Sequence, residues 1–325
     1  GSYDPGKWRL FEWNMTESQF NEYPKIGEFA PGKAFWFITS TKNILLDTGP
    51  GLSVNTSEPF LVVLKKGWND IGNPFNFEVA WEDIFLTSAA ETNQIIGPYS
   101  FDGSWTFGEQ VETMKPWEGY SIYTESEDLT LLIPPQMAKT QLGKNNSLAS
   151  FSDVEWALSI EAKNDDVADK ANFIGIAENA SEKFDYGYDY VEPPGVGSYI
   201  SLYFNHPDWE LEAEKFSSDF RAPQEGYIWE FEVTGTNSDK PVELAVHKKT
   251  ELPENLSLHL IDLSANISIN LRNDSTYTFL LSGKNSIRRF KLIAGSDEFL
   301  DEHQEELVTI ETYGLVQNYP NPFNG

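Results

Sequence analysis

The sequence predicts an all-β protein made of two β-sandwich-like domains, and three observations carry this prediction. Aromatic residues make up 14% of the 325 residues, which is typical of strands and their packed faces. Apolar and polar residues alternate through the second half of the chain, and only residues 298–307 show a helical pattern. The length gives each of two domains enough residues to bury its own core.

Composition limits the partners of the chain. Its formal net charge of −28 repels phosphate backbones and anionic lipid headgroups, so nucleic acid and membrane surfaces are poor partners, whereas divalent cations and neutral glycans are compatible with it. The chain has no cysteine, which excludes disulfides, thiol catalysis and thiolate metal sites. It also has no run of about 18 apolar residues that could span a bilayer.

Residues 1–137 are expected to form the first domain, a β-domain rich in tryptophan and glycine. Residues 34–38 have the pattern of a continuous apolar strand, and residues 43–47 continue it as a hairpin. Residues 116–123 and 129–133 repeat this pattern at a shift of 85 residues. The repeat predicts an internally duplicated sandwich or barrel, with chance similarity between two short hairpins as the alternative.

The stretch 64–81 is the centre of this domain. A strand pattern at 60–64 leads into it, and Gly72, Asn73 and Pro74 predict a tight turn, because glycine accepts a positive φ and proline fixes its own φ. Large apolar side chains flank the turn, namely Trp68, Ile71, Phe75, Phe77, Val79 and Trp81. We interpret the stretch as a corner of the β core, with a ligand-binding turn as the alternative.

Two motifs in the first domain resemble a known group of β-rich modules. The sequence GWNDIGNPF at 67–75 is similar to a GWN-x-IGNPF signature, and PGKAFW at 31–36 is similar to a strand that usually accompanies it. Such modules recur in large exported proteins of Bacteroidetes-type bacteria. The resemblance implies an exported surface protein and no settled activity.

Residues 138–150 are predicted to be a linker, because they are polar, lack aromatic residues and follow two prolines. Residues 151–296 are expected to form a second sandwich, of immunoglobulin or jelly-roll type. Its short strands are indicated by alternating apolar residues at 156–160, 229–233, 242–246, 256–260, 267–269, 277–279 and 290–292.

An acidic linker and a short motif follow the second domain. Residues 297–312 carry seven acidic residues and no lysine or arginine. Within residues 313–325, the segment LVQNYPNPFN at 315–324 resembles the opening of the C-terminal sorting domain read by the type IX secretion system, here expected to be truncated. The resemblance implies passage through the periplasm, a secreted or cell-surface location, and the secretion machinery as a partner.

Five acidic residues of the second domain form a candidate calcium site: Asp165, Asp166, Asp169, Asp185 and Asp189. Carboxylate oxygens carried on loops are the ligands that Ca²⁺ needs. The residue order of a regular calcium loop is absent, so solvated loop carboxylates are the alternative.

Four aromatic residues are candidates for glycan binding. Tyr186, Tyr188 and Tyr190 alternate with Gly187 and Asp189, so they would share one face of an extended segment. Rings in a row can stack on sugar faces, as can the ring of Trp105 in the first domain. Packing against a neighbouring strand is the alternative.

Catalytic signatures are not recognisable in the sequence. The four histidines are far apart, and neither a His-Glu-x-x-His pair nor a Gly-x-Ser-x-Gly elbow occurs. The sequence therefore favours a non-catalytic secreted or cell-surface module that is adhesive or glycan-binding. The alternative is an extracellular polysaccharide hydrolase, because 51 acidic residues supply many candidates for a catalytic carboxylate pair.

Overall fold

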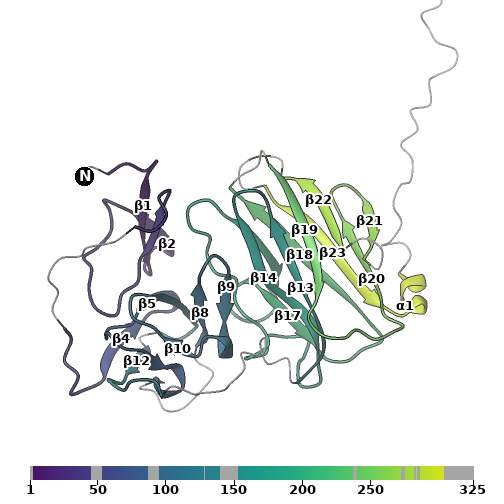
Figure 1. Ribbon diagram of the computed structural model, residues 1–325. Helices are drawn as coiled ribbons and strands as arrows, with labels where there is room; N and C mark the ends of the chain where they lie inside the picture. Colours follow the sequence, from purple (N-terminus) through teal and green to yellow (C-terminus); the bar gives the residue numbers. More distant parts are fainter. Residues whose placement is uncertain are drawn as a thin grey trace, which may run out of the picture.

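The computed structural model shows a nearly all-β chain, which confirms the predicted fold class (Figure 1). The residues that the structure describes are 3–44, 53–86, 95–127, 129–139, 153–236, 240–271, 275–281, 283 and 286–303. Within these ranges, no helix has the length and apolar character needed to cross a membrane.

The first domain consists of short strands in several small sheets. The sheet orders are β2-β1-β3, β10-β6, β5-β11-β8-β9 and β4-β12-β7. The strands are β1 (Trp8–Asn14), β2 (Gln19–Glu22), β3 (Trp36–Thr39), β4 (Phe60–Leu64), β5 (Gly67–Gly72), β6 (Val79–Ala80), β7 (Phe85–Leu86), β8 (Ile96–Phe101), β9 (Trp105–Phe107), β10 (Thr113–Met114), β11 (Gly119–Thr124) and β12 (Leu129–Ile133). Two 3₁₀ helices, η1 (Trp81–Asp83) and η2 (Gly108–Gln110), connect them.

The core of the first domain lies between two of these sheets. Leu129, Leu131 and Ile133 alternate along β12 and are all buried, while Ile71 of β5 and Ile122 of β11 face them from the other sheet. Burying every second side chain is what the strand period of two dictates. The apolar runs recognised at 60–64, 116–123 and 129–133 therefore contain strands that enclose this core, whereas the run at 34–38 contains β3 of another sheet.

The corner predicted around 64–81 is confirmed. Phe75 and Val79 are buried in the same core. The Asn73 Nδ2 donates to the backbone carbonyls of Phe77 and Met114 at 2.8 and 2.6 Å, and its Oδ1 accepts from the Phe75 amide at 2.8 Å. One asparagine thus satisfies three backbone groups and ties the turn to β10.

The two units of the proposed duplication occupy different environments. Strand β3 pairs with β1, whereas β11 lies between β5 and β8. Phe37 of β3 is 37% exposed, but Ile122, at the matching position of β11, is fully buried. Most of the hairpin partner expected at 43–47 lies outside the described residues.

The second domain is the predicted sandwich of two larger sheets, with orders β17-β14-β13-β19-β22 and β16-β15-β18-β23-β20-β21. Pairing is antiparallel except between β14 and β17. The strands are β13 (Val154–Lys163), β14 (Ala168–Ala177), β15 (Ile200–Asn205), β16 (Lys215–Phe216), β17 (Ser218–Arg221), β18 (Gly226–Gly235), β19 (Pro241–Lys248), β20 (Ser257–Asp262), β21 (Ile267–Asn270), β22 (Thr276–Leu280) and β23 (Arg288–Gly295).

One continuous core fills the space between these two sheets. The alternating residues predicted for β18, which are Trp229, Phe231 and Val233, point into it, and Leu244 and Leu260 do the same from β19 and β20. All five are at most 1% exposed. Burial of large apolar side chains on both inner faces is what stabilises a sandwich.

The predicted helix forms, but it ends at Glu302 and not at the predicted residue 307. Helix α1 (Asp297–Glu302) begins one residue before the predicted start, because the Ser296 Oγ accepts a hydrogen bond from the Phe299 amide and caps the first turn. Leu300 is buried against the second domain. The acidic segment and the sorting-like motif beyond residue 303 lie outside the described residues.

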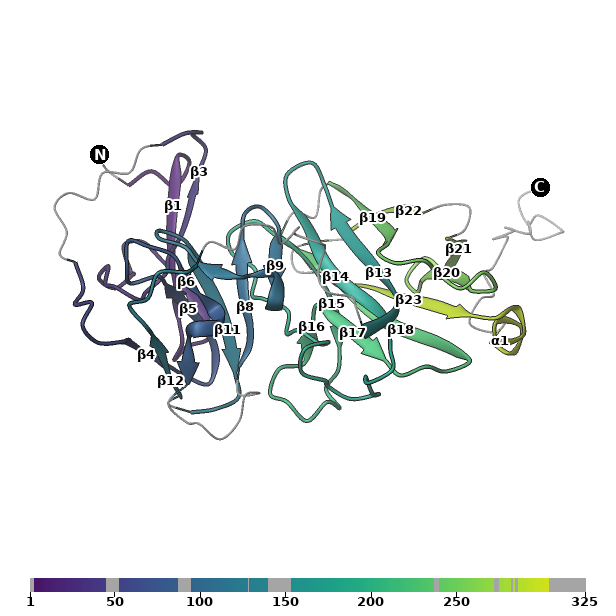
Figure 2. The same cartoon turned by 60° about the horizontal axis from the view of Figure 1, so that its bottom comes forward.

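An apolar and aromatic contact joins the two domains. We call it the interdomain seam, and its buried members are Ile96, Tyr99, Phe107, Tyr123, Ala171, Val191, Trp209 and Phe216. The Phe107 ring lies 4.4 Å from that of Tyr190, and the Tyr99 hydroxyl donates to the Val191 carbonyl at 2.9 Å. In both views, β8 and β9 are the strands of the first domain that lie next to the second (Figure 2).

Candidate functional site

An open groove of about 520 Å³ lies over β2 and the turns that flank β1 and β2 in the first domain. It combines aromatic rings with amide, carboxylate and ammonium groups. Its lining residues are Tyr3, Pro5, Gln19, Phe20, Asn21, Glu22, Tyr23, Pro24 and Lys25. We call it the β1–β2 groove.

The aromatic side of the groove is a cluster of rings. Tyr3 lies 4.9 Å from Trp8 and 5.2 Å from Tyr23, with edge-to-face angles, and Trp8 lies 5.6 Å from Tyr23. Tyr23 is 39% exposed. Tyr23 is therefore a surface ring that packs against the rings of Tyr3 and Trp8, and these contacts restrict its orientation.

Glu22, which lines the groove, forms an ion pair with Arg9. The Arg9 Nε and Nη2 donate to the two Glu22 carboxylate oxygens, both at 2.7 Å, and the Tyr3 hydroxyl donates to the same carboxylate. The hydrogen bonds from Arg9 lower the pKa of Glu22 to about 2. Glu22 is therefore ionised at neutral pH, and it orients both Tyr3 and Arg9.

The three tyrosines predicted to share a face do not do so. The Tyr188 and Asp189 amides both donate to the Asp185 carbonyl, and Gly187 has φ +90°, so this segment is a tight turn rather than an extended strand. The expectation of a shared face is therefore wrong, because that turn ends the alternation on which it depended.

The three rings instead pack against separate neighbours. Tyr186 contacts Phe184 at 4.8 Å and is 39% exposed, Tyr188 lies 6.0 Å from Phe220, and Tyr190 packs in the interdomain seam. Glycan binding by these residues stays a prediction.

Trp105 lies in an aromatic triangle of the first domain. Its ring is 5.5 Å from Trp36 and 5.2 Å from Phe101. Trp36 also donates its Nε1 hydrogen to Asp70 at 2.9 Å. Since Trp105 is half-buried and Phe101 is 47% exposed, Phe101 presents the more accessible ring of the triangle.

The structure separates the five predicted calcium ligands. Asp165 and Asp166 are exposed in the turn between β13 and β14, and Asp166 forms an ion pair with Lys240 at 2.7 Å. Asp169 is buried on β14. Asp185 and Asp189 belong to the loop before β15. Among the described residues, no group of three or more histidines, cysteines and acids is placed to hold one ion.

The carboxylates of that loop accept hydrogen bonds from backbone and side-chain donors. Asp185 accepts from the Ser181 amide and hydroxyl at 2.6 and 2.9 Å. Asp189 is fully buried and accepts from the amides of Asp185 and Phe220 at 2.8 and 3.0 Å. These contacts hold the loop against β17.

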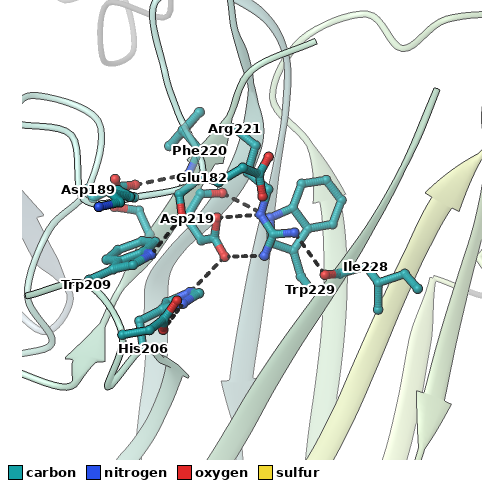
Figure 3. Close-up of polar contacts among 12 residues, drawn as sticks. Glu182, Asp189, His206, Trp209, Asp219, Phe220, Arg221, Ile228 and Trp229 are labelled. Carbon is teal, nitrogen blue, oxygen red and sulfur yellow. Dashed lines mark hydrogen bonds and ion pairs between the residues drawn. The ribbon is translucent and has the colours of Figure 1, made fainter. Parts of the chain in front are cut away.

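Sequence reasoning missed a buried charge network next to this loop (Figure 3). Asp219 of β17 is 1% exposed, and it accepts from His206 Nε2 at 2.9 Å and from Arg221 Nε and Nη2 at 2.9 and 2.8 Å. Burial raises the pKa of Asp219, but these hydrogen bonds outweigh burial and leave it below its ordinary value. The His206 ring stacks on Trp209 at 3.8 Å.

The hydrogen bonds of this network stabilise the structure around β17. The Asp219 carboxylate accepts from three nitrogens, which are His206 Nε2 and the Nε and Nη2 of Arg221. Arg221 also donates to the Ile228 carbonyl at 3.0 Å. The residues come from β17 and from the loop after β15, so no spacing in the sequence announces that they meet. The network fixes that loop over the sheet edge.

Trp117 is the most exposed large apolar residue of the described chain, at 89%. It lies in the turn between Lys115 and Glu118, where the Glu118 amide donates to the Lys115 carbonyl at 3.4 Å. Pro116 precedes Trp117, and the φ of Trp117 is +66°. This is the arrangement of a type II turn, whose third position normally holds glycine or asparagine. The turn thus presents an indole ring to solvent from a strained position.

Comparisons with protein families, curated proteins and solved structures find no significant match to this chain.

Proposed function

We propose that the chain is a non-catalytic secreted or cell-surface module that binds an extracellular polysaccharide or surface glycan. The β1–β2 groove carries this proposal, because it combines aromatic rings with polar side chains along an open surface. Sugars present an apolar face to a ring and hydroxyls to amide and charged groups, so a shallow groove of this composition is suited to a neutral chain of sugars.

The charge of the protein favours the same ligand class. The net charge of −28 repels an anionic polymer, whereas a neutral glycan approaches the protein without electrostatic repulsion. Asn21, Gln19 and Lys25 supply donors at the groove, and the Arg9–Glu22 pair keeps the neighbouring side chains in place.

Export by the type IX secretion system is the second part of the proposal. It rests on the resemblance of residues 315–324 to the start of a sorting domain and of residues 67–75 to modules of exported proteins. A glycan-binding module outside the cell would meet its ligand directly after export.

The test is a polysaccharide pull-down with the purified chain, followed by titration with the captured glycan. Replacing Tyr23 with alanine removes one exposed ring worth about 1 kcal/mol of stacking, so we expect binding to weaken roughly fivefold. The matched control is Trp117→Ala, which removes an exposed ring outside the groove and should bind as the unchanged protein does. Thermal melts verify that both variants are folded.

Two results would contradict the proposal. Loss of binding in Trp117→Ala with full binding in Tyr23→Ala would move the ligand away from the groove. Release of reducing sugars that stops when one carboxylate is mutated would make the chain a hydrolase.

A further inference from the structure

Asp169 and Asn172 place two polar side chains inside the second domain on the same strand, β14. Asp169 is 6% exposed and its Oδ2 accepts from the Leu202 amide at 2.7 Å. Asn172 is fully buried, and neither its Nδ2 nor its Oδ1 has a hydrogen-bond partner. Its amide lies next to the Asp169 carboxylate. A buried amide without a hydrogen-bond partner is costly, so the Asn172 oxygen has accepting capacity that a ligand could use.

Glu192 brings a second carboxylate to the same region. It follows Val191, whose carbonyl accepts the Tyr99 hydroxyl across the interdomain seam. The Ser201 and Ser217 hydroxyls donate to Glu192 Oε1 and Oε2 at 2.7 and 2.6 Å, which fixes the carboxylate in one orientation.

The charges in this region are not balanced by the chain. Neither Asp169 nor Glu192 forms an ion pair with a described lysine, arginine or histidine. Lys215 acts on Glu192 at longer range, with its Nζ placed over the Tyr203 ring at 4.3 Å. The Leu202 amide that donates to Asp169 and the Ser201 hydroxyl that donates to Glu192 belong to consecutive residues of β15, so the two carboxylates lie close together. Glu161 also lies near Asp169, but it forms its own ion pairs with Lys163 and Lys170 at 3.9 and 3.8 Å.

We propose that Asp169, Asn172 and Glu192 bind a divalent cation, Ca²⁺, inside the second domain. A cation there would neutralise the two carboxylates and give the Asn172 Oδ1 a partner. Oxygen is the only donor type that the three side chains offer an ion, which matches a hard cation rather than zinc. Ca²⁺ fits better than Mg²⁺, because it accepts irregular arrangements of protein oxygens, whereas Mg²⁺ requires a near-ideal octahedron.

The site differs from the calcium site expected from the sequence. It keeps Asp169, replaces the loop carboxylates with Asn172 and Glu192, and lies behind the interdomain seam. Through Val191, the position of Glu192 is linked to the hydrogen bond from Tyr99. Bound Ca²⁺ would therefore stabilise the seam as well as the second domain.

The experiment measures metal content and melting temperature of the full chain. After removal of metals with a chelator and dialysis against micromolar Ca²⁺, we expect one Ca²⁺ per chain by elemental analysis. At constant ionic strength, the melting temperature should rise by several degrees from chelator to millimolar Ca²⁺, and less in Mg²⁺. Asn172→Leu and Glu192→Gln should each lose the shift. Glu178→Gln, which changes an exposed carboxylate in the turn after β14, should keep it.

The metal content of the unchanged protein decides the question even if a core variant does not fold. Absence of bound Ca²⁺ together with identical melts in chelator and Ca²⁺ would overturn the proposal, and would mean that a proton occupies the carboxylate pair. A shift that is lost in Asp166→Asn and kept in Asn172→Leu would place the ion in the turn between β13 and β14, and would overturn it equally.

Discussion

Asp70 lies where three strands of the first domain meet, and its carboxylate links them. Its Oδ2 accepts from Trp36 Nε1 of β3 at 2.9 Å and its Oδ1 accepts from the Ser121 hydroxyl of β11 at 2.6 Å. Burial raises its pKa from 3.8 to about 6, and the two hydrogen bonds only partly oppose this shift. An acid whose pKa is higher in the folded state than in the unfolded state stabilises the fold at low pH and loses that contribution as pH rises.

The stability of the first domain should therefore decrease as pH rises from about 4 to about 6 through the ionisation of Asp70. In Asp70→Asn, the amide oxygen can still accept from Trp36, the amide nitrogen can donate to Ser121, and the ionisation is absent. We expect this variant to be about 1–2 kcal/mol more stable than the unchanged protein at pH 7, and to lose the advantage near pH 4. Urea unfolding at several pH values measures the difference. Parallel curves at all pH values would show that Asp70 does not titrate as described.

Strand β9 and helix η2 contact Tyr190 in the interdomain seam. Gly108 begins η2 with φ +64°, and a Cβ added there would lie 2.0 Å from the Tyr190 hydroxyl oxygen. A side chain at this position must displace the ring of Tyr190 or part the two domains. The seam therefore depends on a glycine at this position for its contact distance as well as for its backbone angle.

Gly108→Ala should separate the unfolding of the two domains. We expect the single melting transition of the unchanged chain to become two, because the cores of the domains are intact but the seam is not. Gly103→Ala is the matched control, since Gly103 also has a positive φ, +109°, but has open space around it. Differential scanning calorimetry compares the two variants. Equal behaviour of both would assign the effect to backbone strain rather than to the seam.

The strands that the sequence revealed are those in which large apolar residues alternate with small or polar ones. Strands β13, β18 and β19 were predicted because their apolar residues alternate. Strand β15 was missed because Leu202, Tyr203 and Phe204 are large and buried in succession, which removes the period of two. Residues 156–160 of β13 are also all buried, but there large apolar residues alternate with alanine and serine. The expectation that Tyr186, Tyr188 and Tyr190 share one face was wrong for another reason: Gly187 turns the chain, and the alternation of residue types in a sequence does not show one positive φ.

The candidate site was predictable only in its chemistry. The sequence indicated aromatic glycan contacts, but the β1–β2 groove brings Tyr3 together with Phe20 and Tyr23 from another segment, so the spacing between Tyr3 and the other two rings is not informative. The buried pair of Asp169 and Glu192 also comes from different segments of the chain. Each residue alone is one of 51 acids, and the fold selects which two are brought close together.

At the scale of the whole molecule, the net charge of −28 is the dominant electrostatic property. Like charges that cannot move apart destabilise a compact state. Salt screens this repulsion, since the Debye length falls from about 10 Å at 0.1 M to about 3 Å at 1 M. Salt also weakens surface ion pairs such as Lys183–Glu210, but an exposed pair contributes at most about 1 kcal/mol.

Added salt should therefore stabilise the protein. We expect the melting temperature to rise by a few degrees between 20 mM and 0.5 M sodium chloride, because screening of the net charge exceeds the loss of exposed ion pairs. Tetramethylammonium chloride serves as the control, as it screens charge but is too large for a buried carboxylate site. A rise in the sodium salt alone would point to cation binding, and a fall in both would show that the ion pairs dominate.

The interdomain seam changes the meaning of the covalent connection between the domains. Tyr99, Phe107 and Tyr190 are in contact across the seam, and the peptide chain that joins the two domains raises the effective concentration of each domain at the other. A molecule cut in this connecting chain would stay together above the dissociation constant of the seam and come apart on dilution. The two domains are in this sense a heterodimer encoded as one chain, in which translation fixes the one-to-one ratio and the aromatic contacts fix the orientation.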